Sequence, residues 1–169
     1  NTTASLKMSW SLNQYKQFYN NEPTDFNNEE KFINLRLESK FLKRINVSYN
    51  GSARFGKSYS VSAHDLANTV NRFDQNLSVS GALFKKINLT ATGRQITTLR
   101  SGFADISYLF TDLNLKWKLT KLKADLDVEI NNLSNIKSYQ LIQIENNRLS
   151  YGNYQLRGIN GLLRATFFL

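Results

Sequence analysis

The chain has 169 residues, of which 41% are hydrophobic and 21% charged, and it carries a formal net charge of +9. This composition is too apolar for a disordered tail, and the length suits one folded domain covering residues 1–169. There is no Cys and one His, His64, which excludes disulfides, thiolate metal sites and a Cys nucleophile, and no run of about 18 apolar residues predicts a transmembrane helix.

Apolar and polar residues alternate with a period of two along most of the chain, which predicts strands with one face of each kind. In 45–55, every odd-numbered residue is apolar or Gly and every even-numbered residue is polar. In chain order, the predicted strands centre on 6–12, 33–37, 45–55, 77–83, 87–93, 113–119, 122–130 and 159–169. These are about eight strands of roughly nine to thirteen residues, longer than ordinary globular strands and close to a tilted membrane-spanning strand.

The links between the strands alternate between short and long. The short links are 42–44, 84–86 and 120–121, and the long polar ones are 14–30, 56–72, 95–105 and 136–153. Short turns at one end and long loops at the other are typical of outer-membrane barrels, whose short turns are periplasmic. We therefore predict an all-β fold, an antiparallel up-and-down transmembrane β-barrel in the bacterial outer membrane.

The alternation also assigns the two faces of the strands. A two-residue turn at Thr120–Lys121 would set Lys116 opposite Asp125 and Asn114 opposite Asp127. Such polar faces would line a wet lumen, while the apolar faces contact lipid. The lumen-facing candidates are Arg54, Arg94, Lys116, Asp125, Asp127 and Glu129. The aromatic residues near strand ends, which predict interfacial girdles, are Trp10, Phe41, Phe55, Tyr59, Phe84, Tyr108, Phe110, Trp117, Phe167 and Phe168.

Catalysis has little support in this pattern. Asp125, Asp127 and Glu129 alternate on one strand face and could be taken for paired catalytic carboxylates, but no nucleophile or metal partner accompanies them. His64 lies in a polar link beside Asp65, which is the setting of a solvated His. We expect no enzyme activity, no cofactor and no metal site.

The positive charge alone would fit a nucleic-acid or polyanion binder. The cations are instead spread over strand faces and over the short links, where they are Lys43, Arg44, Lys85, Lys86 and Lys121. This spread argues against a nucleic-acid partner and fits turns at a charged interface together with a lumen for a polar solute.

The last third carries a family resemblance. Strand 113–119, a turn and strand 122–130 lead into Asn131-Asn-Leu-Ser-Asn135, and Tyr154-Gln-Leu-Arg157 precedes a last strand ending in Phe167-Phe-Leu169. Residues 106–169 thereby resemble the end of TonB-dependent receptor barrels of the Bacteroidetes type, whose motif is Asn-Leu-Phe-Asn and whose last residue is aromatic. Here Ser134 replaces the Phe and Leu169 the final aromatic residue. The matching positions are Asn132, Leu133, Asn135, Arg157, Phe167 and Phe168.

The resemblance implies outer-membrane transport of a large nutrient such as a metal chelate, a glycan or a peptide, through a barrel of about 22 strands that holds a plug. Implied partners are outer-membrane lipid and lipopolysaccharide, the N-terminal plug, the TonB energy-coupling system and a surface lipoprotein. The links 14–30, 56–72 and 136–153 would help to capture the solute. Because neither Met nor a leader segment opens the chain at Asn1, we expect a mature product or a piece of a longer protein.

Two alternatives stay open. The first is a self-contained eight-stranded outer-membrane barrel that acts as an adhesin or structural protein, because eight strands also make the smallest common barrel. The second is a soluble basic β-protein that binds polyanions.

Overall fold

The computed structural model describes residues 2–41, 44–61, 67–145 and 148–168, and these form ten β-strands and one 3-10 turn. The elements are β1 (Thr2–Tyr19), β2 (Glu22–Phe41), β3 (Ile45–Ser60), β4 (Ala67–Phe84), β5 (Ile87–Arg100), β6 (Ile106–Leu119), η1 (Thr120–Leu122), β7 (Ala124–Asn131), β8 (Ser138–Glu145), β9 (Arg148–Gln155) and β10 (Asn160–Phe167). The all-β prediction is therefore confirmed. Within the described ranges, no helix has the length and apolar character needed to cross a membrane.

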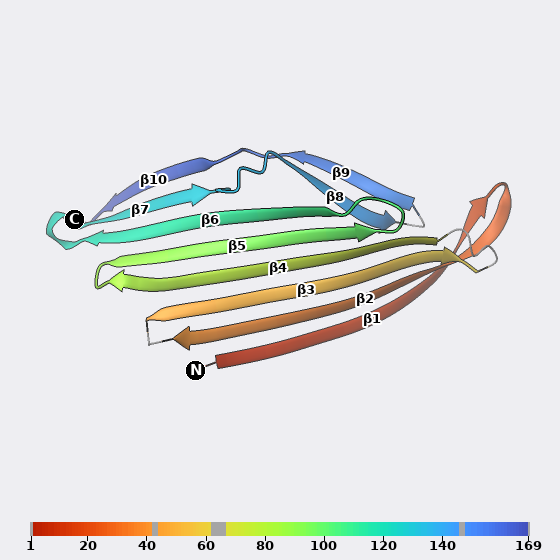
Figure 1. Cartoon of the computed structure of the whole chain (residues 1–169), viewed down its shortest axis with the longest axis horizontal. Coiled ribbons are helices and arrows are strands. Elements are labelled where there is room, and N and C mark those ends of the chain that lie inside the picture. The colour runs from red at the N-terminus through yellow and green to blue at the C-terminus, as the bar shows by residue number, and fades with distance from the viewer. Residues whose placement is uncertain (1, 42–43, 62–66, 146–147, 169) are drawn as a thin grey trace.

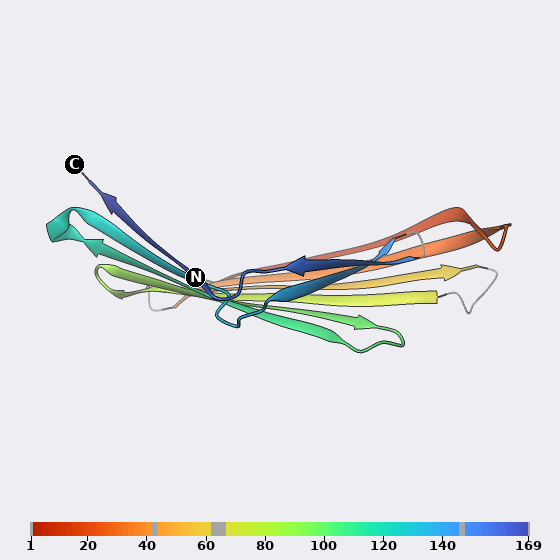
Figure 2. The same cartoon turned by 90° about the horizontal axis from the view of Figure 1, so that it is seen from above.

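Eight strands form one antiparallel sheet in the order β1-β2-β3-β4-β5-β6-β7-β10 (Figure 1). The eight predicted strand segments fall on these eight strands, which confirms the up-and-down antiparallel arrangement. In the described part of the chain, β1 and β10 each pair with one neighbour only, so the sheet is open along both edges. Figure 2 shows that the sheet twists strongly along its length, as long antiparallel sheets do.

Strands β8 and β9 form a separate hairpin between β7 and β10. The sequence predicts a long polar link over 136–153, and most of that segment is instead this hairpin. Its buried residue Ile142 lies against the main sheet, where β8 contacts β3 and β4. The hairpin is thus stabilised by packing on the sheet, a long-range effect that local alternation does not reveal.

The predicted link 14–30 is also wrong. Strands β1 and β2 run through it and are joined by a two-residue turn at Asn20 and Asn21, whose φ angles are 50° and 65°. Two positive φ angles are what a type I′ hairpin turn requires, and Asn tolerates them. Pro23 pairs with Phe18 on β1 and lies beyond the β2 residues that pair with β3, so its missing N–H costs no ladder bond on that side.

The turn between β6 and β7 is longer than the predicted two residues. After η1, Lys123 takes a left-handed φ of 45°, and the pairing shifts by two residues. Lys116 consequently lies opposite Asp127 rather than Asp125, and Asp125 lies opposite Lys118. A shift of two residues leaves every side chain on its predicted face, whereas a shift of one would reverse the faces.

Two aromatic residues assigned to the girdle face the other way. Tyr108 and Phe110 lie on the polar face of β6 and pack against Tyr139 of β8, with ring centroids 5.1 and 6.2 Å apart respectively. The buried Val70 and Ile96 lie on the same face. This face therefore carries a small apolar core beneath the hairpin, at the end of the sheet away from the short turns.

Candidate functional site

The polar side chains of the main sheet share one face, and the strand register places all six lumen-facing candidates on it. These are Arg54 on β3, Arg94 on β5, Lys116 on β6, and Asp125, Asp127 and Glu129 on β7. The hairpin β8–β9 packs on the same face and covers part of it, so this polar face is the floor of a hollow that we call the trough. That this trough is a barrel lumen stays a prediction.

An ion-pair network crosses the middle of the trough. Arg94 donates from Nε and Nη2 to the two carboxylate oxygens of Asp74, at 2.9 and 2.6 Å. The Nη2 of Arg72 lies 3.6 Å from Asp74, and the Nε of Arg54 lies 3.3 Å from the carboxylate of Glu30. Three guanidinium groups thus share two carboxylates, and Arg54 and Arg72 are direct cross-strand neighbours. Each guanidinium group therefore has a carboxylate partner, which offsets the repulsion between the neighbouring cations Arg54 and Arg72.

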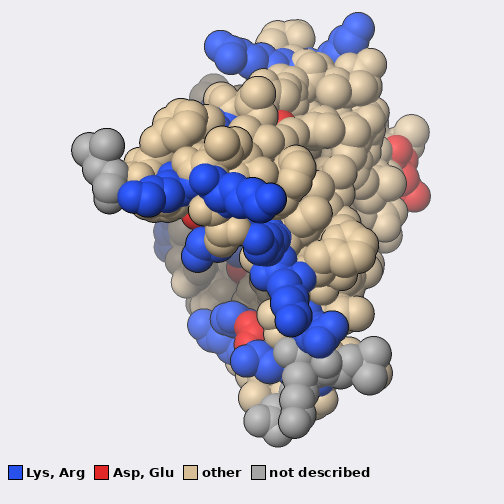
Figure 3. Space-filling model, turned by 90° about the vertical axis from the view of Figure 1, so that its left-hand side faces the viewer, with Lys and Arg blue, Asp and Glu red and all other residues tan. Residues whose placement is uncertain are grey.

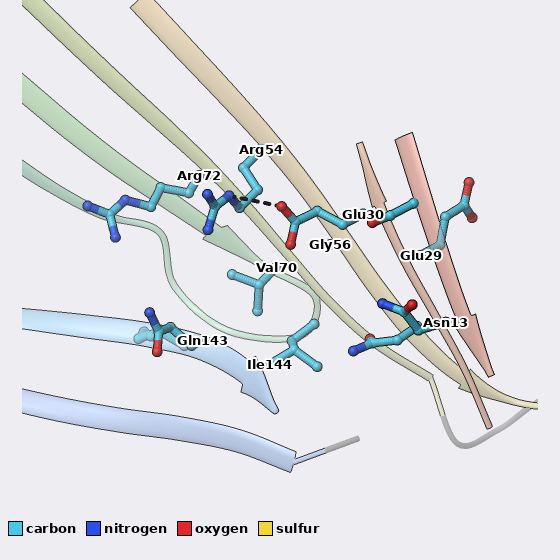
Figure 4. Close-up of a pocket in the computed structure, with 12 residues that line it drawn as sticks. Asn13, Glu29, Glu30, Arg54, Gly56, Val70, Arg72, Gln143 and Ile144 are labelled. Carbon is cyan, nitrogen blue, oxygen red and sulfur yellow. Dashed lines mark ion pairs between the residues drawn. The ribbon is translucent and has the colours of Figure 1, made fainter. Parts of the chain in front are cut away.

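A cavity of about 240 Å³ lies between this network and the hairpin. Figure 4 shows Arg54 bridged to Glu30 on one side of it and Val70 and Ile144 on the other. The lining residues are Ser11, Asn13, Asn28, Glu29, Glu30, Arg54, Gly56, Val70, Arg72, Ile142, Gln143 and Ile144. Guanidinium and amide groups facing an aliphatic wall can bind a polar organic solute that carries both hydrogen-bond acceptors and apolar carbon.

Glu29 lies at the border of the cavity, and its side chain points away from it (Figure 4). The Lys31 ammonium, 3.0 Å away, holds the pKa of the Glu29 carboxyl below its ordinary range, and the Trp10 indole donates to the same carboxylate.

The hairpin is held over the cavity by polar and apolar contacts together. The backbone N–H of Gln140 donates to the Tyr108 hydroxyl at 3.1 Å, beside the contact between the Tyr108 and Tyr139 rings. A Cβ on Gly56 would lie 3.3 Å from the Val70 carbonyl oxygen and 3.9 Å from the tip of Ile144. Glycine at 56 therefore lets the hairpin side chains approach the sheet backbone closely.

A second hollow, of about 350 Å³, lies toward the short turns. Asp127 accepts a 2.8 Å hydrogen bond from the Asn114 amide, lies 3.8 Å from the Lys116 ammonium and is the cross-strand partner of Arg164. Asp125 also lines this hollow, whereas Glu129 pairs with Asn114 outside it. These charges neutralise one another in part, as expected for a polar wall.

No cluster of three or more His, Cys, Asp or Glu side chains that could hold a metal ion occurs among the described residues. His64 and Asp65 lie outside them.

The residues that carry the family resemblance lie in two places, at the base of the hairpin and at the end of β10. Asn132 is buried, with a left-handed φ of 57°, and its side chain bonds to Ile136 and Arg157. Leu133 donates its N–H to the Thr111 carbonyl, and Asn135 also has a left-handed φ, of 54°. On β10 and just beyond it, Phe167 lies opposite Ala124 with its ring exposed, and Phe168 donates its N–H to the Lys123 carbonyl. Leu169 lies outside the described residues.

Sequence reasoning missed several residues of the cavity and of the network beside it, namely Glu30, Arg72, Asp74, Ile142, Gln143 and Ile144. A signal for two of them was present, because Arg72 and Asp74 continue the parity of the polar residues Asn76 and Ser78. The apolar side of β4 is interrupted by Gln75, and this hid the extension of the strand.

No family model matches the chain, and comparison with curated proteins and with solved structures finds no significant match.

Proposed function

We propose that this chain forms part of the wall of an outer-membrane β-barrel transporter, with the trough as its lumen and the hairpin β8–β9 as an outer loop folded inward. In this arrangement the wall contacts lipid, and the ion-pair network and the cavity beside it contact the passing solute. The transported class is the one implied by the resemblance to TonB-dependent receptors, a large polar nutrient. One observation carries the proposal: on β1, β2 and β3 the outward face of the sheet is apolar beside the short turns and becomes polar toward the other end of the strands.

The apolar part of that face lies beside the short turns and is exposed. On β3, the outward positions from Ile45 to Phe55 are apolar or Gly, and the next one is Lys57. On β1, the outward residues 6–12 are apolar, Met8 is 65% exposed, and Gln14 and Lys16 follow. On β2, residues 33–37 are apolar on this face, and toward the far end Lys31, Glu29 and Asn27 replace them. We call this exposed band the apolar belt.

The height of the apolar belt matches a bilayer. Residues 45–55 are eleven residues. At a rise of about 3.3 Å per residue and a tilt of about 40°, they span about 25 Å, which is the height of the lipid-facing band of outer-membrane barrels. A soluble sheet would bury such a face beneath a second layer. The hairpin packs on the opposite, polar face, so it does not supply that layer.

The trough favours a segment of a large barrel over a closed eight-stranded one. An eight-stranded barrel has an interior that its own side chains nearly fill. Here, a two-stranded hairpin with Tyr139 and Ile142 lies against the inner face. Strands β1 and β10 are the two ends of the sheet order and each has one paired neighbour within the described ranges, which leaves edges for further strands.

Extraction and intact mass test the proposal. We expect the native polypeptide to leave an outer-membrane fraction only with detergent and to have a mass several times the 19.5 kDa of this chain. Release by high salt without detergent would contradict the proposal and favour the soluble polyanion binder. Detergent extraction with a mass near 19.5 kDa would favour the small adhesin-like barrel.

A further inference from the structure

The short-turn end of the sheet carries a row of basic residues. They lie in the three links that join β2 to β3, β4 to β5 and β6 to β7, and we call them the basic rim: Arg44, Lys85, Lys86, Lys121 and Lys123. The sequence of the same links, which also includes Lys43, contains no Asp or Glu. Figure 3 looks onto this end and shows Lys and Arg gathered in a band across it.

No member of the basic rim belongs to an ion pair among the described residues. At the opposite end, charges of both signs meet, as in the pairs Lys16 with Asp25 at 3.9 Å and Lys31 with Glu29 at 3.0 Å. Within the described ranges, the short-turn end thus gathers cations that have no ion-pair partner, whereas charges of both signs meet at the other end.

Exposed aromatic rings lie between this rim and the belt. Phe84, the last residue of β4, is 70% exposed and directly precedes Lys85. Trp117 of β6 is 42% exposed on the outward face, where it pairs with Ile87. Aromatic rings at the headgroup level, with Lys and Arg just beyond them, form the characteristic order of groups at a membrane interface.

We propose that the basic rim binds the anionic headgroups of the phospholipid leaflet that surrounds the short-turn end, so that it fixes the depth of the wall in the bilayer. This inference rests on the proposed function and adds a lipid class and five named cations to it. The cations lie on three successive turns in a band across one end of the sheet (Figure 3), an arrangement that fits a lipid surface better than a compact acidic protein.

Lipid selectivity tests the proposal directly. The full-length protein is reconstituted in phosphatidylcholine bilayers with a trace of spin-labelled phosphatidylglycerol or phosphatidylcholine, and electron paramagnetic resonance gives the fraction of each label held at the protein surface. We expect phosphatidylglycerol to associate at least about threefold more strongly at low salt. The preference should fall toward unity at about 0.5 M NaCl, where exposed charges are screened within a few ångström.

Two triple variants locate the effect. Lys85→Gln, Lys86→Gln and Lys121→Gln together should abolish the preference, while the matched control Lys16→Gln, Lys31→Gln and Lys57→Gln, at the other end of the same strands, should keep it. Equal association of both lipids with the unaltered protein would overturn the rim proposal while leaving the membrane wall intact. A preference lost in the control alone would also overturn it. Failure to insert into any bilayer would refute the proposed function itself.

Discussion

The side-chain amide of Asn132 donates a 2.9 Å hydrogen bond to the carbonyl oxygen of Arg157, 25 residues later in the chain. The same amide nitrogen donates to the Ile136 carbonyl at 2.7 Å, and its oxygen accepts the Ile136 N–H at 3.0 Å. One side chain thus joins the start and the end of the excursion that carries the hairpin. Asn suits this position doubly, because it also tolerates the left-handed backbone found there.

Replacing Asn132 with Ala should lower the free energy of unfolding by about 2 kcal/mol, because two partly buried carbonyls and an N–H lose their partner. Urea unfolding of the reconstituted protein measures this change. Asn132→Gly keeps a backbone that accepts a positive φ and removes only the side-chain bonds, so it should be destabilised to a similar extent. If Asn132→Gly were as stable as the unaltered protein, backbone strain and not hydrogen bonding would explain the alanine variant.

The assignment of the two faces predicts opposite outcomes for adjacent substitutions. Val47 faces outward beside Val79 in the apolar belt, whereas Ser48 lies on the polar face beside Glu38. Val47→Lys should cost about 1 to 2 kcal/mol of stability in a bilayer, because Val47 lies near the short-turn edge of the belt, where the penalty for Lys is between its interfacial and its midplane value. Ser48→Lys should be tolerated, because it adds a cation beside a carboxylate in the wet trough.

Membrane insertion of the two lysine variants, scored by protection from added protease, is the measurement. The protein with Ser48→Lys serves as the control for added charge. Equal insertion of both variants would refute the facing assignment.

The pair of Arg94 and Asp74 gives a test of the ion-pair network. A double-mutant cycle with Arg94→Gln and Asp74→Asn should give a coupling energy of up to about 1 kcal/mol, because the bidentate geometry is good but the Arg94 side chain is half exposed. The coupling should shrink between low and high salt. A coupling near zero at low salt would mean that the two groups do not constrain each other.

Alternation along the chain was sufficient to predict the eight strands of the main sheet, because each has one apolar and one polar face where it crosses the belt. The prediction failed where that contrast ends. Strands β1 and β2 continue through 14–30 with polar residues on both faces, so periodicity carries no signal there. The hairpin was not predicted for a different reason, since Ile142 is buried by residues of β3 and β4 that lie far away in sequence.

The candidate site was predictable in part for the same physical reason. The positions of Arg54 and Arg94 on the polar face follow from parity alone. Their partners could not be identified, because the choice of Glu30 for Arg54 and of Asp74 for Arg94 depends on strand order and register. The predicted register of β7 differs from the observed one by two residues, because the turn at 120–123 is longer than a two-residue hairpin turn.

Closure of the hairpin over the cavity depends on Tyr108, whose hydroxyl accepts the Gln140 N–H and whose ring packs on Tyr139. Tyr108→Phe keeps the ring and removes the acceptor, so we expect amide exchange in 138–145 to accelerate about fivefold, which corresponds to the loss of one hydrogen bond. Tyr108→Ala should accelerate it further, because the aromatic contact is lost as well. Tyr151→Phe is the matched control, since its side chain is 48% exposed on β9 and the variant removes the same hydroxyl group. Hydrogen exchange with mass spectrometry resolves these peptides, and equal rates in Tyr108→Phe and the control would show that the hairpin is held by its apolar contacts alone.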